Sequence, residues 1–261
     1  MLQQFLKDTK KYWAYALRAA KADLKSEVAT NHLGWLWWIL DPLLFMLIYS
    51  FVAIVVFNKN VQYLAAFIFV GLSCWDFFSK TIKQSVKLVS GNKPVVSKVY
   101  LPKFVLIYVR MMVNGFKMFI SFSLVVGMMI IYQVPLTYRI IYFPFLLILL
   151  SLLTFGISCI MLHAGVFVED LFNVINAFLR LVFYLSGIFY SLPDRVHGWI
   201  GFVLLKCNPF AAIITSMRSC VLYSSDPDFI TMAIWLVIAV ILTVIGVRLI
   251  YKNENSYVKV M

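Results

Sequence analysis

Charged side chains inside apolar stretches are the best candidates for chemistry in this sequence. Arg110 and Lys117 recur at helical spacing within one apolar run, and Arg180 lies midway along another. Because a charge at the centre of a membrane helix costs about 2.5 to 3.5 kcal/mol, such residues usually face a bundle interior or a cavity. The three cations predict a path for a molecule that carries an anionic group, such as a lipid-linked phosphate. Structural roles stay open, through pairing of Arg110 with Asp76 or Glu169 or through snorkelling toward the cytoplasm.

Motifs of common enzymes are absent from the sequence. No Gly-x-x-x-x-Gly-Lys-Ser/Thr motif is present, so no P-loop for a nucleotide is expected. His32, His163 and His197 are isolated and lack the spacing of a zinc site. Glu169 and Asp170 are adjacent, which directs them to different sides of a helix rather than at one substrate atom. We therefore expect a protein that is not an enzyme and has no metal or cofactor of its own.

Composition indicates an integral membrane protein. The chain of 261 residues is 63% hydrophobic and only 13% charged, against about 25% charged in soluble proteins. Its apolar runs are continuous rather than alternating, which favours helices over a barrel. We predict an all-α membrane protein with a single six-span transmembrane domain over residues 31 to 261. The expected spans are 33 to 57, 61 to 79, 104 to 132, 139 to 163, 171 to 190 and 229 to 251.

Residues 1 to 30 predict an N-terminal amphipathic interface helix. When the segment is wound at about 100° per residue, one face is apolar and the other is basic. The apolar face holds Phe5, Tyr12, Trp13, Ala16, Leu17, Ala20 and Leu24, and the basic face holds Lys7, Lys10, Lys11, Arg18, Lys21 and Lys25. We expect the apolar face in the headgroup boundary and the basic face toward anionic lipid or a cytosolic partner. A membrane anchor without further role is the alternative.

Lysine and arginine are divided unequally between the two sides of the predicted bundle. Sixteen lie in or beside the N-terminal tail, the connection between spans two and three, and the C-terminal tail: Lys7, Lys10, Lys11, Arg18, Lys21, Lys25, Lys80, Lys83, Lys87, Lys93, Lys98, Lys103, Arg110, Arg248, Lys252 and Lys259. Five lie on the other side: Lys59, Arg139, Arg195, Lys206 and Arg218. The positive-inside rule therefore predicts a multi-pass protein of the plasma membrane with both termini in the cytoplasm. The net charge of +12 reflects this topology, and no nucleic-acid partner is expected.

The connection over about residues 90 to 103 predicts a cytoplasmic turn. Lys80, Lys83 and Lys87 share one helical face, so the second helix is expected to project beyond the membrane. Gly91 then ends it and Pro94 starts a turn, because glycine closes helices and proline cannot continue them. The basic and apolar residues that follow suit a docking surface, with a solvated connector as the alternative.

The segment from about 191 to 229 predicts a re-entrant helical hairpin between spans five and six. It contains two apolar runs, 196 to 205 and 210 to 223, and both are shorter than the ~20 residues needed to cross. Asn208 and Pro209 have the types expected at the N-cap and first position of the second helix. Cys207 and Cys220 lie in this segment and could pair or remain free.

Aromatic residues follow one face of the first span and one face of the fifth. The first face holds Trp35, Trp38, Phe45 and Tyr49, and the second holds Phe172, Phe183 and Tyr190. Aromatic rings can stack on the apolar faces of sugars, and they also pack helices together. A substrate channel and simple helix packing both stay open from these residues.

The order of these features resembles the permease subunit of polysaccharide-exporting ABC transporters. The matching pieces are Leu33-Gly34-Trp35-Leu36-Trp37-Trp38 with Pro42, the turn from Asn92 to Lys103, Phe167-Val168-Glu169-Asp170, Leu185 to Ser191 with Pro193, and Asn208-Pro209-Phe210 leading to Arg218. The chain departs from the pattern at Phe167 or Val168, where an arginine is common, and at Asp41, where an asparagine often precedes the proline.

The resemblance implies a homodimer with two copies of a separate cytosolic nucleotide-binding ATPase, which would bind ATP and Mg²⁺. It implies export of a lipid-linked glycan such as O antigen, teichoic acid or capsule. ATPase coupling would fall to the turn residues Asn92, Lys93, Pro94, Val95, Ser97, Lys98 and Tyr100. Alternatives are an ABC permease for drugs or small lipids, and an ATP-independent channel or secondary transporter, although the sequence shows no convincing internal repeat of the kind found in many secondary transporters.

Overall fold

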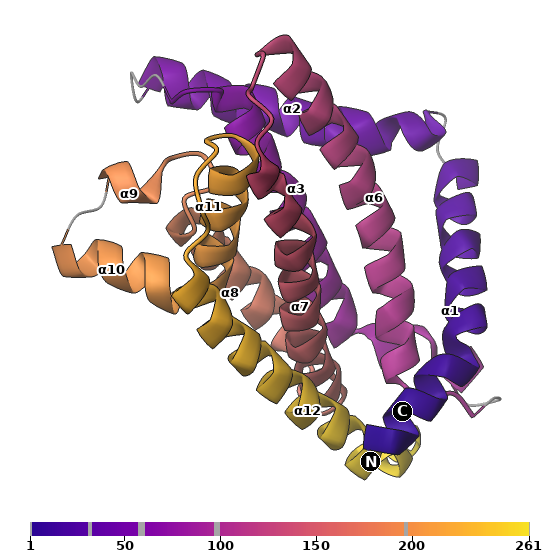
Figure 1. The fold of residues 1–261 in the computed structure, drawn as a ribbon. Helices are drawn as coiled ribbons and strands as arrows, with labels where there is room; N and C mark the ends of the chain where they lie inside the picture. The colour runs from indigo at the N-terminus through magenta and orange to yellow at the C-terminus, as the bar shows by residue number, and fades with distance from the viewer. Residues whose placement is uncertain (1, 31–32, 57–60, 97–99, 196–197, 261) are drawn as a thin grey trace.

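The computed structural model describes residues 2–30, 33–56, 61–96, 100–195 and 198–260 (Figure 1). Over these residues the chain is helical and contains no strand, which confirms the all-α prediction. The elements are α1 (Leu2–Thr30), η1 (Gly34–Leu36), α2 (Trp37–Phe51), η2 (Val52–Val56), α3 (Leu64–Val86), α4 (Leu88–Gly91), α5 (Lys93–Val96), α6 (Phe104–Ile131), η3 (Tyr138–Ile141), α7 (Tyr142–Phe167), α8 (Leu171–Leu185), α9 (Leu192–Arg195), α10 (Gly198–Cys207), α11 (Pro209–Val221) and α12 (Phe229–Val260).

Five of the six predicted spans correspond to helices that are long and apolar enough to cross a membrane. Within the described residues these are Gly34–Phe51, Leu64–Val86, Phe104–Ile131, Tyr138–Phe167 and Phe229–Glu254. The remaining predicted span corresponds to α8, which has 15 residues and ends five residues before the expected position. It stops there because Gly187 adopts a left-handed φ of 65°, a conformation that closes helices.

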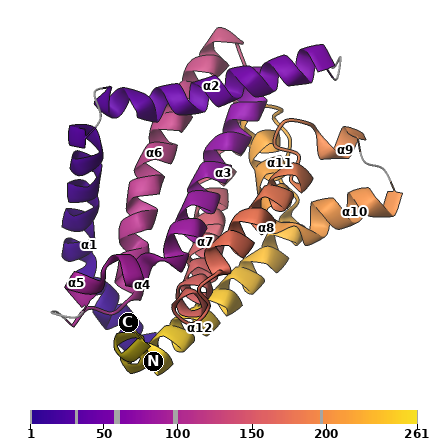
Figure 2. The same cartoon turned by 180° about the vertical axis from the view of Figure 1, so that it is seen from behind.

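Helix α3 forms the centre of the bundle. Most of its side chains are buried by contacts with α2, α6, α7, α8 and α11. Helix α2 lies across α6 and α3 rather than along them (Figure 2), and Met46 is its one buried residue among those described. The first predicted span therefore adds little to the core of a single chain, and most of its surface is free for lipid or another protein.

Helices α7 and α12 make the most extensive helix pair in the structure. A Cβ atom on Gly156 would lie 2.8 Å from the backbone nitrogen of Thr243, and one on Gly246 would lie 2.6 Å from Cys159 Cβ. Small residues at this interface let the two backbones approach closely, as is common between membrane helices.

The connections gather at two opposite ends of the bundle. Both termini lie at one end, close to α4 (Figures 1 and 2). At the other end, Thr137 Oγ1 donates a hydrogen bond to Ser224 Oγ (2.6 Å) and Arg139 Nε lies 2.7 Å from Asp226 Oδ1. Tyr223 donates a hydrogen bond to the Gln62 carbonyl (3.0 Å) at the same end. The predicted outer connections therefore meet one another, away from the two termini and α4.

The two half-length helices of the outer segment are confirmed as α10 and α11, which bend by 89° between them. Asn208 Oδ1 accepts hydrogen bonds from the backbone nitrogens of Phe210 (3.1 Å) and Ala211 (3.2 Å), and Pro209 begins α11. The predicted N-cap and first-turn roles are therefore correct. Helix α11 is largely buried, whereas α10 exposes apolar side chains such as Trp199.

Helix α1 packs on the protein more than the sequence predicted. Its six basic side chains are exposed as expected. On the apolar face, however, Ala16 and Ala20 are buried and the Phe5 ring lies 5.0 Å from the Phe104 ring of α6. Only part of this face, including Trp13, stays exposed and free to meet a headgroup layer. The small alanines allow this, because they let α1 approach α6 closely.

The last helix extends to Val260, nine residues beyond the predicted end of the sixth span. Polar residues of this extension find partners within the protein. Glu254 pairs with the buried Lys103 ammonium (3.3 Å) and accepts a hydrogen bond from the Tyr100 hydroxyl (3.2 Å). The Tyr257 hydroxyl lies 2.8 Å from His163 Nδ1. These contacts explain why the helix continues after its apolar run has ended.

Asp228 at the start of α12 makes stability depend on pH. Its carboxylate pairs with Lys206 and accepts a hydrogen bond from the Thr231 backbone nitrogen (3.2 Å), as an N-cap does. The bond from Lys206 lowers the pKa of Asp228 below its ordinary value. Because the folded-state pKa is lowered, this stabilisation is present above the unfolded pKa of about 3.9 and is lost as the pH falls through the folded value.

We expect Asp228→Ala to lower the melting temperature in detergent at pH 7, because it removes a cap of about 1 kcal/mol and an ion pair. The difference from wild type should shrink as the pH approaches 3. Ser225→Ala, in the same connection but without a cap role, is the control. A difference that is unchanged between pH 7 and pH 3 would contradict this account.

Candidate functional site

Predicted channel residues from two distant segments meet in one cavity of about 490 Å³, here called the aromatic cavity. Phe45 and Tyr49 of α2 line it together with Arg180 and Phe183 of α8. The other lining residues are Pro42, Leu72, Ser73, Trp75, Asp76, Lys83, Ser121 and Tyr184. The cavity therefore brings residues of α2 and α8 together within one chain.

Ring contacts connect the walls of the aromatic cavity. Tyr49 stacks on Phe189 with 5.5 Å between ring centroids, and its ring lies 5.7 Å from that of Phe183. Tyr190 packs against Phe189 at 5.3 Å and donates a hydrogen bond to the Tyr184 carbonyl (2.8 Å). The rings thus form a continuous surface whose apolar faces could stack on sugars.

Trp38 and Lys117 lie in a neighbouring polar pocket of about 310 Å³ between α2, α3 and α6. The Lys117 ammonium lies 6.0 Å from the centroid of the Trp38 ring. Lys80 in this pocket lies 2.7 Å from Asp76 and 3.8 Å from Asp41. Trp35 lies in η1, is 58% exposed and does not line the cavities described here.

Carboxylates of α1 pair with two of the predicted substrate-binding cations. Arg110 Nη1 lies 2.9 Å from Asp23, and Lys117 Nζ lies 2.6 Å from Glu27. Arg110 therefore has an ionic partner, as the structural alternative required, but that partner is Asp23 rather than Asp76 or Glu169. These pairs hold α1 against α6, and they offset the charges that the sequence alone offered to a substrate.

A third pocket, of about 480 Å³, is lined by four cations and no carboxylate and is called the cationic pocket. Its lining residues are Lys80, Lys83, Gln84, Lys87, Leu88, Gly91, Asn92, Arg110 and Phe172. The Lys87 ammonium lies 4.5 Å from the centroid of the Phe172 ring. Lys83 lines both this pocket and the aromatic cavity. Sequence reasoning assigned Lys83 and Lys87 only to topology and overlooked them as site residues.

The predicted coupling segment forms two short helices, α4 and α5, at the end where the termini lie (Figure 2). Asn92 Nδ2 donates a hydrogen bond to the Leu88 carbonyl (2.7 Å), and Lys93 and Pro94 are exposed in α5. Tyr100 is 63% exposed, and the partial desolvation of its hydroxyl beside the Glu254 carboxylate raises the pKa of Tyr100. Val95 belongs to α5, and Ser97 and Lys98 lie outside the described residues.

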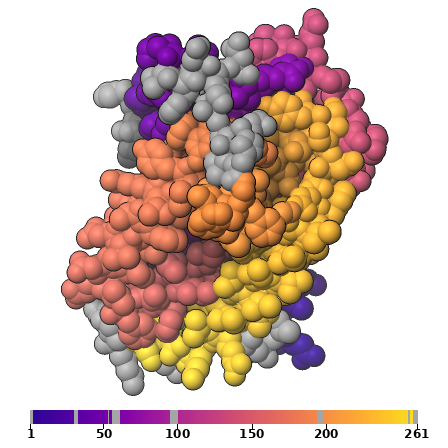
Figure 3. Space-filling view, turned by 90° about the vertical axis from the view of Figure 1, so that its left-hand side faces the viewer, coloured from indigo at the N-terminus to yellow at the C-terminus, as the bar shows by residue number. Residues whose placement is uncertain are grey.

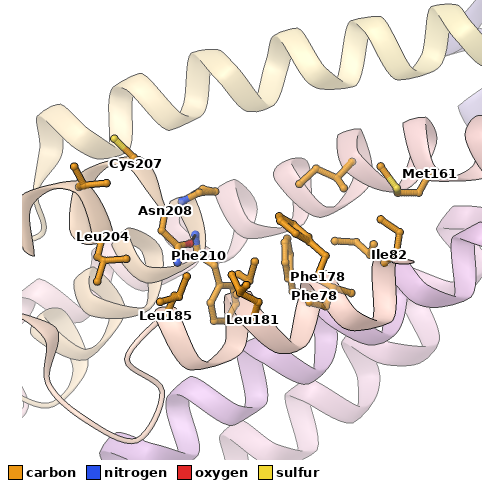
Figure 4. Close-up of a pocket in the computed structure, with 16 residues that line it drawn as sticks. Phe78, Ile82, Met161, Phe178, Leu181, Leu185, Leu204, Cys207, Asn208 and Phe210 are labelled. Carbon is orange, nitrogen blue, oxygen red and sulfur yellow. Dashed lines mark hydrogen bonds between the residues drawn. The ribbon is translucent and has the colours of Figure 1, made fainter. Parts of the chain in front are cut away.

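An apolar groove of about 410 Å³ lies on another face of the molecule. Its lining residues come from α3, α7, α8, α10 and the start of α11, and they include Phe78, Phe178, Leu181 and Phe210. Figure 3 shows a hollow on the face of the molecule where α8 and α12 are exposed. Asn208 is the polar residue that points toward it, from the bend between α10 and α11 (Figure 4). In a membrane such a surface suits hydrocarbon or another apolar helix.

Arg218 has a structural role that the sequence did not predict. It is 3% exposed and donates hydrogen bonds to the carbonyls of Phe67 (3.0 Å), Gly187 (2.8 Å) and Ile188 (2.6 Å). Its guanidinium carbon also lies 3.5 Å from the centroid of the Phe67 ring. Its position inside the predicted re-entrant segment was a sequence signal for a buried role. The positive-inside count instead grouped Arg218 with the basic residues of the outer side.

The cysteines and acidic residues show no further site within the described part of the chain. Cys207 is exposed and Cys220 is buried, and both are free, so the open question of their pairing is answered in favour of free thiols. No group of three or more histidine, cysteine or acidic residues among those described could hold a metal ion.

Comparison with known proteins extends the sequence resemblance. No protein-family profile matches the chain. An O-antigen export system permease protein, RfbA of Klebsiella pneumoniae, is 25% identical over 243 residues, which are 92% of this chain and 92% of the relative. The chain resembles the permeases of polysaccharide exporters. A second protein of that name from Klebsiella pneumoniae is 24% identical over 243 residues, again 92% of each chain, and one from Myxococcus xanthus is 24% identical over 225 residues, 86% of each.

The similarity to export permeases covers most of each chain rather than one segment. It therefore agrees with the resemblance found from the tryptophan block, the cytoplasmic turn and the Asn208-Pro209 pair, which are spread along the sequence. The similar proteins are named as permeases, which are transport components, and the helices of this structure have the length and composition of a multi-pass membrane protein.

Proposed function

We propose that this chain is the transmembrane permease of an ATP-driven exporter that moves a lipid-linked polysaccharide of O-antigen, teichoic acid or capsule type across the plasma membrane. The observation that carries the proposal is the similarity to O-antigen export permeases over 92% of both chains. The aromatic cavity between α2 and α8 supports the proposal, because its rings can stack on the apolar faces of sugars.

In this proposal the end that holds both termini, α4 and α5 faces the cytoplasm. The argument is the predicted distribution of charge, since the sequence assigns sixteen basic residues to the cytoplasmic side and five to the other. The aromatic cavity and the cationic pocket then lie between the cytoplasmic end and the middle of the bundle.

A separate cytosolic ATPase would supply the energy, in two copies for a homodimer of this chain. ATP and Mg²⁺ would bind to that partner, because this sequence lacks a P-loop. The segment α4–α5 is the proposed docking surface, since Lys93 and Pro94 are exposed there. The exposed faces of α2, α8 and α10 leave room for a second copy.

The structure suggests how movement at the docking surface could reach the cavity. Helix α4 follows α3 with only Lys87 between them, so a push on α4 displaces the end of α3. That helix supplies Trp75, Asp76 and Lys83 to the aromatic cavity. Closure of the two ATPases would thereby separate α2 and α8 of the two subunits and open a path, through which a glycan passes along sites weak enough to leave.

The proposal is tested by deleting the reading frame in its native host. We expect surface polysaccharide to disappear while lipid-linked polysaccharide accumulates inside the cell, and reintroduction of the gene to restore export. Unchanged surface polysaccharide with altered drug or lipid efflux would favour the other class of ABC permease. Export that continues after the partner's nucleotide site is inactivated would favour an ATP-independent transporter.

Replacement of Tyr49 by alanine should reduce polysaccharide export about fivefold, as loss of about 1 kcal/mol of ring stacking predicts. Tyr49 contacts both Phe183 and Phe189. Phe119→Ala, which removes a ring that is 74% exposed and does not line the aromatic cavity, is the control. Export is measured on the cell surface and divided by the abundance of the permease. An equal fall in both quantities would favour a packing role for Tyr49.

A further inference from the structure

The cationic pocket gathers more positive charge than its neighbouring carboxylates offset. Its lining contains Lys80, Lys83, Lys87 and Arg110 and no carboxylate. Lys80 is paired with Asp76, and Arg110 with Asp23. Among the described residues, no carboxylate lies within ion-pair distance of Lys83 or Lys87.

Arg180 adds a further cation beside Lys83, in the adjoining aromatic cavity. It lines the aromatic cavity together with Lys83, and the two side chains interact electrostatically. No ion pair of Arg180 is found in the described part of the chain. Asp76 also lines the aromatic cavity, but its Oδ2 already lies 2.7 Å from Lys80.

The fold holds these cations together despite their repulsion. Lys80, Lys83 and Lys87 share one face of the chain at the end of α3, while Ile82 and Val86 between them are buried in the bundle. The lysines therefore cannot turn away without exposing that buried face. Phe172 of α8 covers Lys87 from the other side. Like charges that the fold keeps side by side create a positive potential, which attracts an anion.

Phosphate is the anion that this arrangement fits best. A lysine ammonium offers three donors and an arginine guanidinium offers a planar fork, and both bind phosphate oxygens. Lys83 lies within one turn of Val86, the last residue of α3, so the site sits near the helix end, where a lipid headgroup would be found. A ring attached to a phosphate between Lys83 and Arg180 would enter the aromatic cavity.

We propose that Lys83, Lys87 and Arg180 bind the phosphate group that joins the transported glycan to its lipid, with the first sugar in the aromatic cavity. This inference rests on the proposed export function and names the part of the substrate that the site recognises. It assigns phosphate binding to Arg180 with Lys83 and Lys87, which have no ion pair among the described residues, rather than to Arg110 and Lys117, which pair with carboxylates of α1.

The test measures binding of farnesyl diphosphate, a soluble lipid diphosphate, to the purified full chain in phosphatidylcholine nanodiscs. We expect Lys83→Met to weaken binding about tenfold, as loss of one charged contact predicts, and Lys83→Met with Arg180→Met to weaken it about a hundredfold. Lys83→Arg should retain binding. Lys252→Met, which removes an exposed lysine at the same end of the molecule, should bind like wild type.

Binding that is unaltered in the Lys83 and Arg180 variants would overturn the proposal. Two competitors distinguish the sources of phosphate. Full competition by phosphatidylglycerol in the nanodisc would instead assign the pocket to membrane phospholipid, and full competition by inorganic diphosphate would assign it to a free anion. Weak competition by both supports a lipid-linked phosphate.

The export function and the phosphate site can be refuted independently, because different measurements test them. Export of surface polysaccharide tests the function, and diphosphate binding to the purified chain tests the site. Restored export together with unaltered binding in the variants would keep the exporter and remove this site. A deletion strain with normal surface polysaccharide would remove the exporter.

Discussion

Replacing Arg218 by methionine is expected to lower the free energy of unfolding by about 3 kcal/mol, from about 1 kcal/mol for each of three lost hydrogen bonds. The guanidinium donates to carbonyls of Phe67, Gly187 and Ile188, and it is buried in the bundle. Methionine fills similar space but leaves these bonds unmade. The free energy of unfolding of Arg218→Lys should fall between those of wild type and Arg218→Met. Lysine keeps the charge but lacks the planar guanidinium that stacks on Phe67.

Denaturant unfolding in detergent measures this effect, with Arg139→Met as the matched control. Arg139 makes an ion pair with Asp226 at the surface of the same end of the bundle, and exposed pairs contribute little. If the two variants lowered the free energy of unfolding equally, the three hydrogen bonds from Arg218 to carbonyls would not be what stabilises this region.

The loss at Arg218 should also reach the aromatic cavity. Gly187 and Ile188 directly precede Phe189 and Tyr190, whose rings continue the surface begun by Tyr49. Arg218 thus fixes the turn after α8 to α3 and α11. We expect Arg218→Met to reduce export per folded molecule as well as abundance.

Gly165→Ala is expected to destabilise the protein by about 3 kcal/mol, the upper end of the range for overpacking. A Cβ atom at this position would lie 2.8 Å from the Val86 carbonyl carbon and closer still to its oxygen. Because the neighbour is backbone rather than a flexible side chain, the ends of α7 and α3 must separate.

Gly127→Ala is the control for Gly165→Ala, because no atom lies within 4 Å of an added Cβ there. It should be neutral or stabilise the protein by up to about 1 kcal/mol, since alanine favours the helix. Melting temperatures in the same detergent compare the two. A Gly165 variant as stable as wild type would mean that the two helix ends can move apart without cost.

Displacement of Val86 has a functional consequence as well. The next residues are Lys87 and α4, which contribute to the cationic pocket and the proposed docking surface. A Gly165 variant that still folds is therefore expected to bind farnesyl diphosphate more weakly than the Gly127 variant.

The sequence predicted the helices well where local properties decide them. The third span was expected over 104 to 132 and is found at Phe104–Ile131. Asn208 and Pro209 were recognised as a cap and first turn because their types satisfy backbone groups locally. The ends of α8 and α12 were less well predicted, because one depends on the backbone at Gly187 and the other on partners of Glu254 and Tyr257.

The site residues were predicted in part. Phe45, Tyr49, Phe183 and Arg180 line one cavity, whereas the sequence indicated only the separate helix faces on which they lie. Trp35 does not line it, and Trp38 lies in the polar pocket beside it. Periodicity shows which residues share a helix face, but it does not show which faces of different helices meet.

The sequence by itself determined that this is a helical membrane protein and where its apolar helices lie. Those properties follow from hydropathy, helical period and capping, each of which is encoded in neighbouring residues. Only the tertiary structure decided which partner each charged side chain has. Arg110 meets Asp23 from 87 residues away, Arg218 meets three backbone carbonyls, and Lys83 has no ion pair among the described residues, because the packing of distant helices determines which charges come within reach of one another.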